Sequence, residues 1–87
     1  MTTYNEVANR EDRLFHQRIK KALVSRLGIE RGMDKYKQLA AVAKVEFNKA
    51  QLETENEVKR NNISKRKANL VFVRELKKLG IKLNDQQ

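Results

Sequence analysis

The sequence has no cysteine, no proline and no tryptophan, and only three glycines and one histidine among its 87 residues. Without cysteine the chain cannot form a disulfide or a thiolate metal site, and His16 alone cannot supply a nitrogen cluster for zinc. We therefore expect neither a metal nor a cofactor. The lack of proline, the scarcity of glycine and a charged fraction of 36% are typical of a helical protein rather than a sandwich or barrel.

Hydrophobic runs long enough to span a membrane are also absent. The apolar run at residues 70–73 is far too short for this, and the N-terminal residues lack the apolar core of a signal peptide. The sequence therefore predicts a cytoplasmic protein with no membrane partner. No phosphate-binding glycine loop, paired histidines or cysteine nucleophile occurs. We predict that the protein is not an enzyme and has no small-molecule substrate.

What the chain does have is positive charge, with 20 Lys and Arg against 11 Asp and Glu and a net charge of +9. Residues 59–82 hold nine of the basic residues and only one acid. A dense block of one sign attracts polyanions through long-range electrostatics. The predicted binding residues in this block are Lys59, Arg60, Lys65, Arg66, Lys67, Arg74, Lys77 and Lys78. Two further lysines outside it, Lys20 and Lys21, are predicted to contribute to binding.

The apolar pattern predicts a single all-α domain over residues 1–87, a helical hairpin or three helices over about 3–27, 34–60 and 63–79. Thr3 and Glu6 have the spacing of a capping box at the first start, and Asp34 suits the second start after a short connection at residues 30–32. Gly28 and Gly80 each stand between a leucine and an isoleucine, which indicates helix ends in a left-handed conformation. At residues 61–62 two asparagines either end the long helix or lie within a continuous one.

One face of the central helix has residues spaced by four and three, which predicts a helix-packing or oligomer seam. A thinner seam of Ala41, Val45 and Leu52 lies on nearly the opposite face. A helix with two apolar faces needs two neighbours, so the sequence predicts a homo-oligomer. The main seam consists of Tyr36, Ala40, Ala43, Phe47, Ala50 and Val58.

A short stretch, residues 60–63 with Arg66 and Lys67, resembles the basic region of the CCAAT/enhancer-binding branch of the basic leucine-zipper family. That resemblance would imply asparagine and arginine side chains reading base edges in the major groove. A zipper has leucines every seven residues over several heptads, whereas the leucines that follow here are unevenly spaced. We therefore assign the chain to no family.

These features predict a small basic accessory protein that binds an anionic partner through residues 59–78. Most favoured is duplex nucleic acid, contacted at the phosphate backbone without sequence specificity, because phosphate neutralisation needs only a row of cations. The alternative is a protein-interaction module, such as an inhibitor, adaptor or assembly component of phage origin, that docks on an acidic protein surface.

Overall fold

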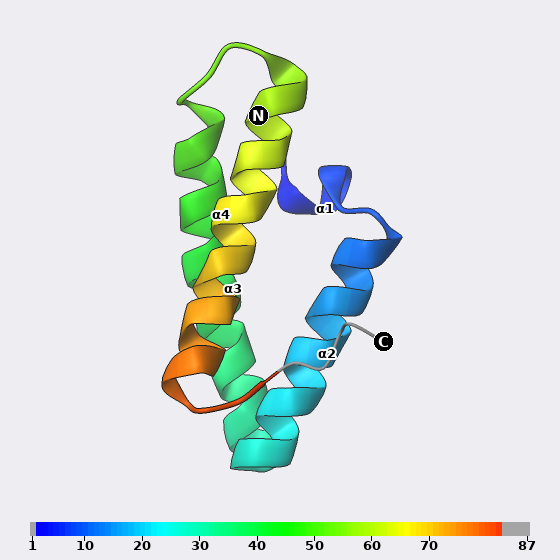
Figure 1. The fold of residues 1–87 in the computed structure, drawn as a ribbon, viewed down its shortest axis with the longest axis vertical. Helices are drawn as coiled ribbons and strands as arrows, with labels where there is room; N and C mark the ends of the chain where they lie inside the picture. The colour runs from blue at the N-terminus through cyan, green and yellow to red at the C-terminus, as the bar shows by residue number, and fades with distance from the viewer. Residues whose placement is uncertain (1, 83–87) are drawn as a thin grey trace.

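The computed structural model describes residues 2–82, and every regular element within them is a helix. Four helices occur in this range: α1 (Tyr4–Val7), α2 (Arg10–Leu27), α3 (Ile29–Gln51) and α4 (Glu57–Lys78) (Figure 1). The all-α prediction is confirmed. Residue 1 and residues 83–87, which the predicted domain included, lie outside the described residues.

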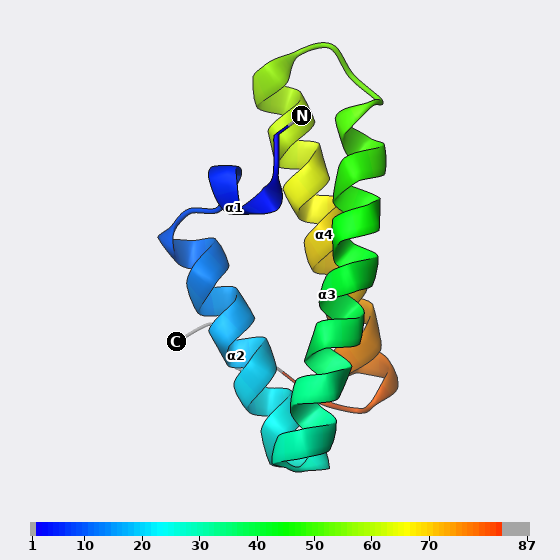
Figure 2. The ribbon, with the colours of Figure 1, turned by 180° about the vertical axis from the view of Figure 1, so that it is seen from behind.

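The helices form an antiparallel hairpin of α3 and α4, with α2 turned back along α3. Figures 1 and 2 show that the end of α2 meets the start of α3 and that the two helices are further apart toward the start of α2. There α1 lies between α2 and the hairpin. The most extensive helix contacts join α3 with α4 and α2 with α3, and α1 contacts α4. Because α1 closes the space between α2 and the hairpin, residues from all four helices meet near the middle of the molecule.

The first predicted helix, over residues 3–27, is divided in two. Thr3 and Glu6 do form the expected capping box at the start of α1. A second capping box follows directly, because the Asn9 side chain accepts from the Asp12 N–H at 2.9 Å and the Asp12 carboxylate accepts from the Asn9 N–H at 3.0 Å. Asn9 is extended and starts a new helix. The prediction of one continuous helix was therefore wrong at residues 8–9.

The second predicted helix, over 34–60, was wrong at both ends. Its start is Ile29 rather than Asp34, since residues 30–32 are helical and Gly28 alone makes the turn from α2. It ends at Gln51, and α4 begins at Glu57, where the Asn56 side chain accepts from the Lys59 N–H at 3.0 Å. The third helix thus starts at 57 instead of 63, and residues 61–62 lie within it.

The two glycine stops have the positive φ that the sequence indicates, but Gly28 is not in the left-handed helical region. Gly28 has φ 93° and Gly80 has φ 73°, and both follow the last residues of a helix. At Gly28 ψ is 165°, which places it in a region that essentially only glycine occupies. The third glycine, Gly32, was expected in a loop but lies buried inside α3 against the backbone of α2.

The core runs along the inner faces of α2, α3 and α4. Most of the predicted seam takes part in it: Ala43, Phe47 and Ala50 are buried, and Tyr36 and Ala40 pack at its edge. Val58 does not, because it belongs to α4 and is 70% exposed. The eight buried residues of the central cluster are Ile19, Leu23, Leu39, Ala43, Phe47, Ala68, Phe72 and Leu76.

A buried polar contact fixes the register of the hairpin near its turn. The Gln51 side-chain amide donates to Ser64 Oγ at 2.9 Å and to Asn61 Oδ1 at 3.0 Å. Ser64 Oγ in turn donates to the Arg60 carbonyl at 2.7 Å. Since an unpaired buried polar group is costly, sliding α4 by one turn would break several bonds at once.

Candidate nucleic-acid interface

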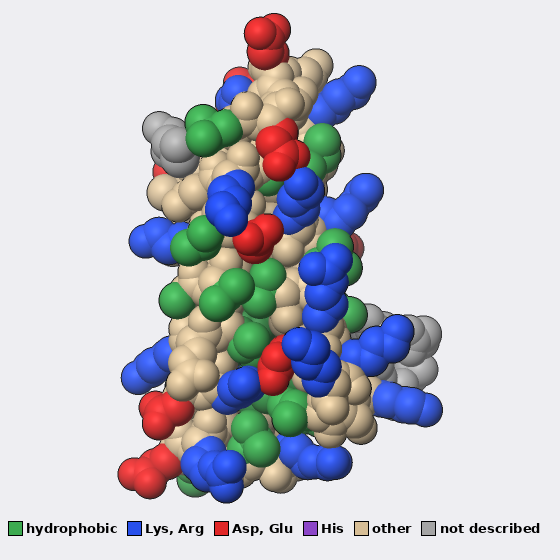
Figure 3. Space-filling view, turned by 90° about the vertical axis from the view of Figure 1, so that its left-hand side faces the viewer, with side chains coloured by type: hydrophobic (Ala, Val, Ile, Leu, Met, Phe, Trp, Pro, Cys, Tyr) green, Lys and Arg blue, Asp and Glu red, His purple; other side chains and the backbone are tan. Residues whose placement is uncertain are grey.

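The outward face of α4 carries an open row of cations. Ser64, Ala68, Phe72 and Leu76 recur at every fourth position on the inward face of this helix. The opposite face is exposed and basic, and at about 1.5 Å per residue its 22 residues span about 33 Å. Figure 3 shows Lys and Arg side chains distributed along the hairpin beside a stripe of hydrophobic ones. The exposed predicted residues on α4 are Lys59, Arg66, Arg74, Lys77 and Lys78.

Of the three other predicted cations on α4, two form ion pairs within the protein and the third is half-buried. Lys65 is mostly buried and pairs with Asp12 of α2 at 3.0 Å, which holds α2 to α4. Lys67 pairs with Glu53 of the hairpin turn at 2.9 Å. Arg60 is half-buried, and its Nε is buried without a hydrogen-bond partner among the described residues. The structure therefore leaves fewer free cations on this face than the sequence count suggests.

The two predicted binding lysines outside the basic block, Lys20 and Lys21, do not lie on the α4 face. Lys20 and Lys21 are on α2, which packs mainly against α3. The Lys20 ammonium is 4.9 Å from the centre of the Tyr36 ring, an arrangement in which a cation is attracted by the π-face. Lys21 is exposed on the outer side of α2.

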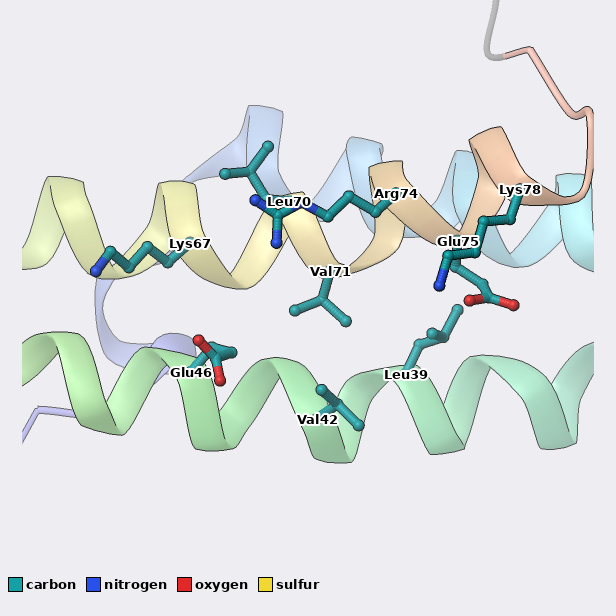
Figure 4. A pocket seen from close by; sticks show the side chains of 9 residues that line it. All are labelled: Leu39, Val42, Glu46, Lys67, Leu70, Val71, Arg74, Glu75 and Lys78. Atoms are coloured by element: carbon teal, nitrogen blue, oxygen red, sulfur yellow. The ribbon is translucent and has the colours of Figure 1, made fainter.

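An apolar groove of about 600 Å³ runs between α3 and α4, beside the basic row. In Figure 4 Val42 and Leu39 of α3 lie opposite Val71 of α4. Glu46 stands on the α3 side, and Glu75 pairs across the helices with Lys35 at 2.8 Å. Lys67, Leu70, Arg74 and Lys78 complete the lining from α4 (Figure 4). The groove thus combines a hydrophobic floor with a mainly basic edge.

No protein-family model, curated protein or solved structure matches this chain. Within residues 2–82, no helix is long and apolar enough to cross a membrane, and no three His, Asp or Glu side chains are grouped as metal ligands. The charge, shape and chemistry of the surfaces therefore carry the functional argument.

A cluster of polar aromatic side chains, which the sequence did not indicate, lies where α1, α2 and α3 meet. His16 Nε2 is 2.9 Å from the Tyr4 hydroxyl, and His16 Nδ1 is 3.1 Å from the Tyr36 hydroxyl. The Tyr4 hydroxyl donates its one proton to Asn69 Oδ1 at 3.2 Å, so it must accept from Nε2–H of His16. Nδ1 is then the acceptor for the Tyr36 hydroxyl proton. The neutral imidazole satisfies every member of this chain.

Burial affects the protonation of all three rings. It lowers the pKa of His16 below the ordinary 6.5, and the nearby Lys20 acts in the same direction, while Asp12 opposes both. Burial also raises the pKa of the Tyr4 and Tyr36 hydroxyls, so both remain protonated donors at neutral pH. The cluster is therefore uncharged under ordinary conditions.

The lowered pKa of His16 predicts a loss of stability on mild acidification. Above pH 6.5 the imidazole is neutral in both the folded and the unfolded chain, so its contribution to folding is fully present. Below that value the unfolded chain takes up the proton more readily, and the contribution is lost as the pH falls through the folded pKa. Urea unfolding between about pH 7 and about pH 5 is expected to show a falling free energy of unfolding.

A His16→Gln variant provides the control for this pH dependence. Gln does not titrate, so its free energy of unfolding should change less over the same interval, although its absolute stability will be lower. Equal slopes in the two proteins would show that His16 is not the group responsible.

Proposed function

We propose that the protein binds duplex nucleic acid through the outward face of α4, by contacts to the phosphate backbone that do not read base sequence. The observation that carries this proposal is the row of exposed cations on one long helix. The one acid between residues 59 and 78, Glu75, faces the groove and is paired with Lys35 at 2.8 Å. A rigid row of this kind neutralises successive phosphates and releases their counterions.

The surroundings of these cations favour backbone contacts to a duplex over recognition of single strands. Single-strand binding relies on exposed aromatic rings on which bases stack. Phe47 and Phe72 are buried, and Tyr4 and Tyr36 lie in the cluster around His16, away from the α4 face. Lysine and arginine on α4 therefore have phosphate as their natural ligand, and affinity should depend little on sequence.

A second function is supported by the apolar groove. Leu70 and Val42, which are 37% and 51% exposed, line the groove together with Lys67, Arg74 and Lys78 of α4. Exposed apolar side chains beside a mainly basic edge suit docking on an acidic protein surface. The thinner seam is also exposed, with Val45 of α3 at 51% and Leu52, directly after α3, at 78%, and we propose that it supports self-association of the chain.

Removing Arg66 and Lys77 together is expected to weaken binding to every duplex alike. Both are exposed on the outward face of α4, and each is proposed to contact one phosphate. The log–log slope of affinity against salt should become shallower by about two units, since each lost contact removes about 0.9. Fluorescence anisotropy with two duplexes of unrelated sequence, over a salt series, measures this.

The matched control is the double variant Arg18→Ala and Lys37→Ala. It removes two exposed cations from α2 and α3, so it lowers the net charge equally without touching α4. If the control flattens the slope as much, overall charge rather than the α4 face drives binding. If no duplex binds at about 0.15 M salt, where charges beyond about 8 Å are screened, the proposal fails and the groove becomes the leading surface. Sedimentation of the same samples reports self-association independently.

A further inference from the structure

A second concave surface, separate from the outward face of α4, opens between α2 and α3 beneath α1, and the inward-facing Ala68 and Phe72 of α4 line it as well. Its volume is about 780 Å³, within the range of sites that hold small organic ligands. Figure 2 shows the helices around it, with α1 and α2 on one side and α3 and α4 on the other. The cleft follows from the divergence of α2 from α3 after their close crossing near Gly32.

The floor of this cleft is aromatic and preorganised. Tyr4, His16 and Tyr36 lie there, joined by the hydrogen bonds described above. His16 meets Phe72 edge to face with ring centres 4.9 Å apart, and Tyr36 stacks on Phe72 at 5.6 Å. A floor of interlocked rings offers apolar edges and faces to a planar ligand at little entropic cost.

The walls of the cleft are positive. Arg13 and Lys20 contribute from α2 and Lys44 from α3, and all three are exposed. None of them forms an ion pair among residues 2–82, and none of the residues lining the cleft is a carboxylate. Asp12, the acid that acts on the floor electrostatically, is already paired with Lys65. The cleft therefore has uncompensated positive charge above an aromatic floor.

Neutral polar groups at the edge add the means to orient a ligand. Asn5 of α1, Gln17 of α2 and Asn48 of α3 line the cleft, and their amides can both donate and accept. Together the three chemistries match a molecule with a planar body, hydrogen-bonding edges and an anionic group.

We propose that this cleft binds a small phosphate ester with a planar aromatic body, of which a nucleoside monophosphate is the simplest form. The aromatic ring lies against the Tyr36 and His16 side of the floor, and Lys20 and Lys44 hold the phosphate from opposite walls. This site is independent of the α4 face and of the nucleic-acid function proposed for it. No glycine-rich phosphate motif is involved, because the phosphate is held by side chains rather than by backbone N–H groups.

The composition of the chain provides reporters for a test. Its single histidine and both of its tyrosines are on the cleft floor. Proton NMR signals of these three rings therefore observe this site. Titration of the full chain with AMP at constant neutral pH is expected to shift the His16 and Tyr signals saturably, whereas adenosine or inorganic phosphate alone should bind about tenfold or more weakly.

Two double variants locate the phosphate contact. Lys20→Gln with Lys44→Gln should weaken AMP binding about tenfold in a protein that stays folded. Its unliganded Tyr36 and His16 signals should shift slightly, because Lys20 lies over the Tyr36 ring and acts on His16. Lys21→Gln with Lys37→Gln removes the same charge from exposed positions of the same helices outside the cleft, and should leave affinity nearly unchanged.

Three results would overturn the proposal. These are ring signals that do not move with AMP, equal weakening by both double variants, and adenosine binding as tightly as AMP. Duplex binding measured on the Lys20 and Lys44 variant keeps the two sites apart, since α4 is intact there and its salt slope should be that of the unmodified protein.

Discussion

Replacing Gly32 with alanine is expected to destabilise this protein, although the same change in an exposed helix interior stabilises by about 0.5–1 kcal/mol. A Cβ added at Gly32 would lie 2.6 Å from the Val24 Cα, 2.7 Å from the Val24 nitrogen and 2.8 Å from the Leu23 carbonyl carbon. All three are backbone atoms, which cannot rotate out of the way. The α2–α3 crossing would have to open, with an expected loss of about 1–3 kcal/mol.

Urea unfolding of Gly32→Ala against the parent protein measures this loss. The neighbouring change Arg31→Ala is the control, since Arg31 is exposed on the same helix and should alter stability by about 0.5 kcal/mol or less. An alanine variant at position 32 that is as stable as the parent would mean that α2 and α3 do not cross here as closely as described.

Truncation of Phe72 to alanine is expected to destabilise the protein strongly. Phe72 is fully buried, packs edge to face on His16 and stacks on Tyr36. Removing a buried phenyl ring costs about 3–5 kcal/mol, through lost burial and the cavity that remains. A domain of this size has a total stability of the same order, so the variant should be largely unfolded at ambient temperature.

Circular dichroism during urea or thermal unfolding shows whether that loss occurs. Val73→Ala is a suitable control because Val73 is the next residue on α4 and is half-exposed. It should stay folded with nearly unchanged stability. Two variants that unfold alike would argue against the inward orientation of Phe72.

The sequence predicted the helical class and several local signals correctly because these depend on neighbouring residues alone. The capping box at Thr3 and the positive φ of Gly28 and Gly80 are of this kind. So is the burial of Phe47, which follows from its place on a regular apolar face. Each of these needs no knowledge of what the segment packs against.

The position of the turn between α3 and α4 could not be predicted from neighbouring residues in this way. The spacing of the α3 seam continues in phase to Val58, and the glutamates at residues 53–57 are compatible with a helix. What ends α3 is tertiary: Gln51 must meet Ser64 of the returning helix, and Asn56 caps the new start. Residues 61–62 looked like the break because asparagine is a good cap, but Asn61 is held by Gln51 inside α4.

The candidate sites also combine features that the sequence shows with contacts that only the fold creates. The concentration of charge at residues 59–78 was visible in the sequence, but the pairing of Lys65 with Asp12 spans 53 positions and could not be inferred. The cleft was invisible as well, since Tyr4, His16 and Tyr36 come from three different helices and share no spacing. Only the folded chain shows that they meet.

The bond from Tyr4 to Asn69 joins residues 65 positions apart and has a consequence for the order of folding. The two most extensive helix contacts, α2 with α3 and α3 with α4, join neighbours in the chain and need only short loops to close. Closing a longer loop costs more chain entropy, so docking of α1 must follow formation of the surface that receives it. A refolding molecule should therefore bury Phe47 and Phe72 between helices first, and Tyr4 should report a later kinetic phase than the far-ultraviolet signal.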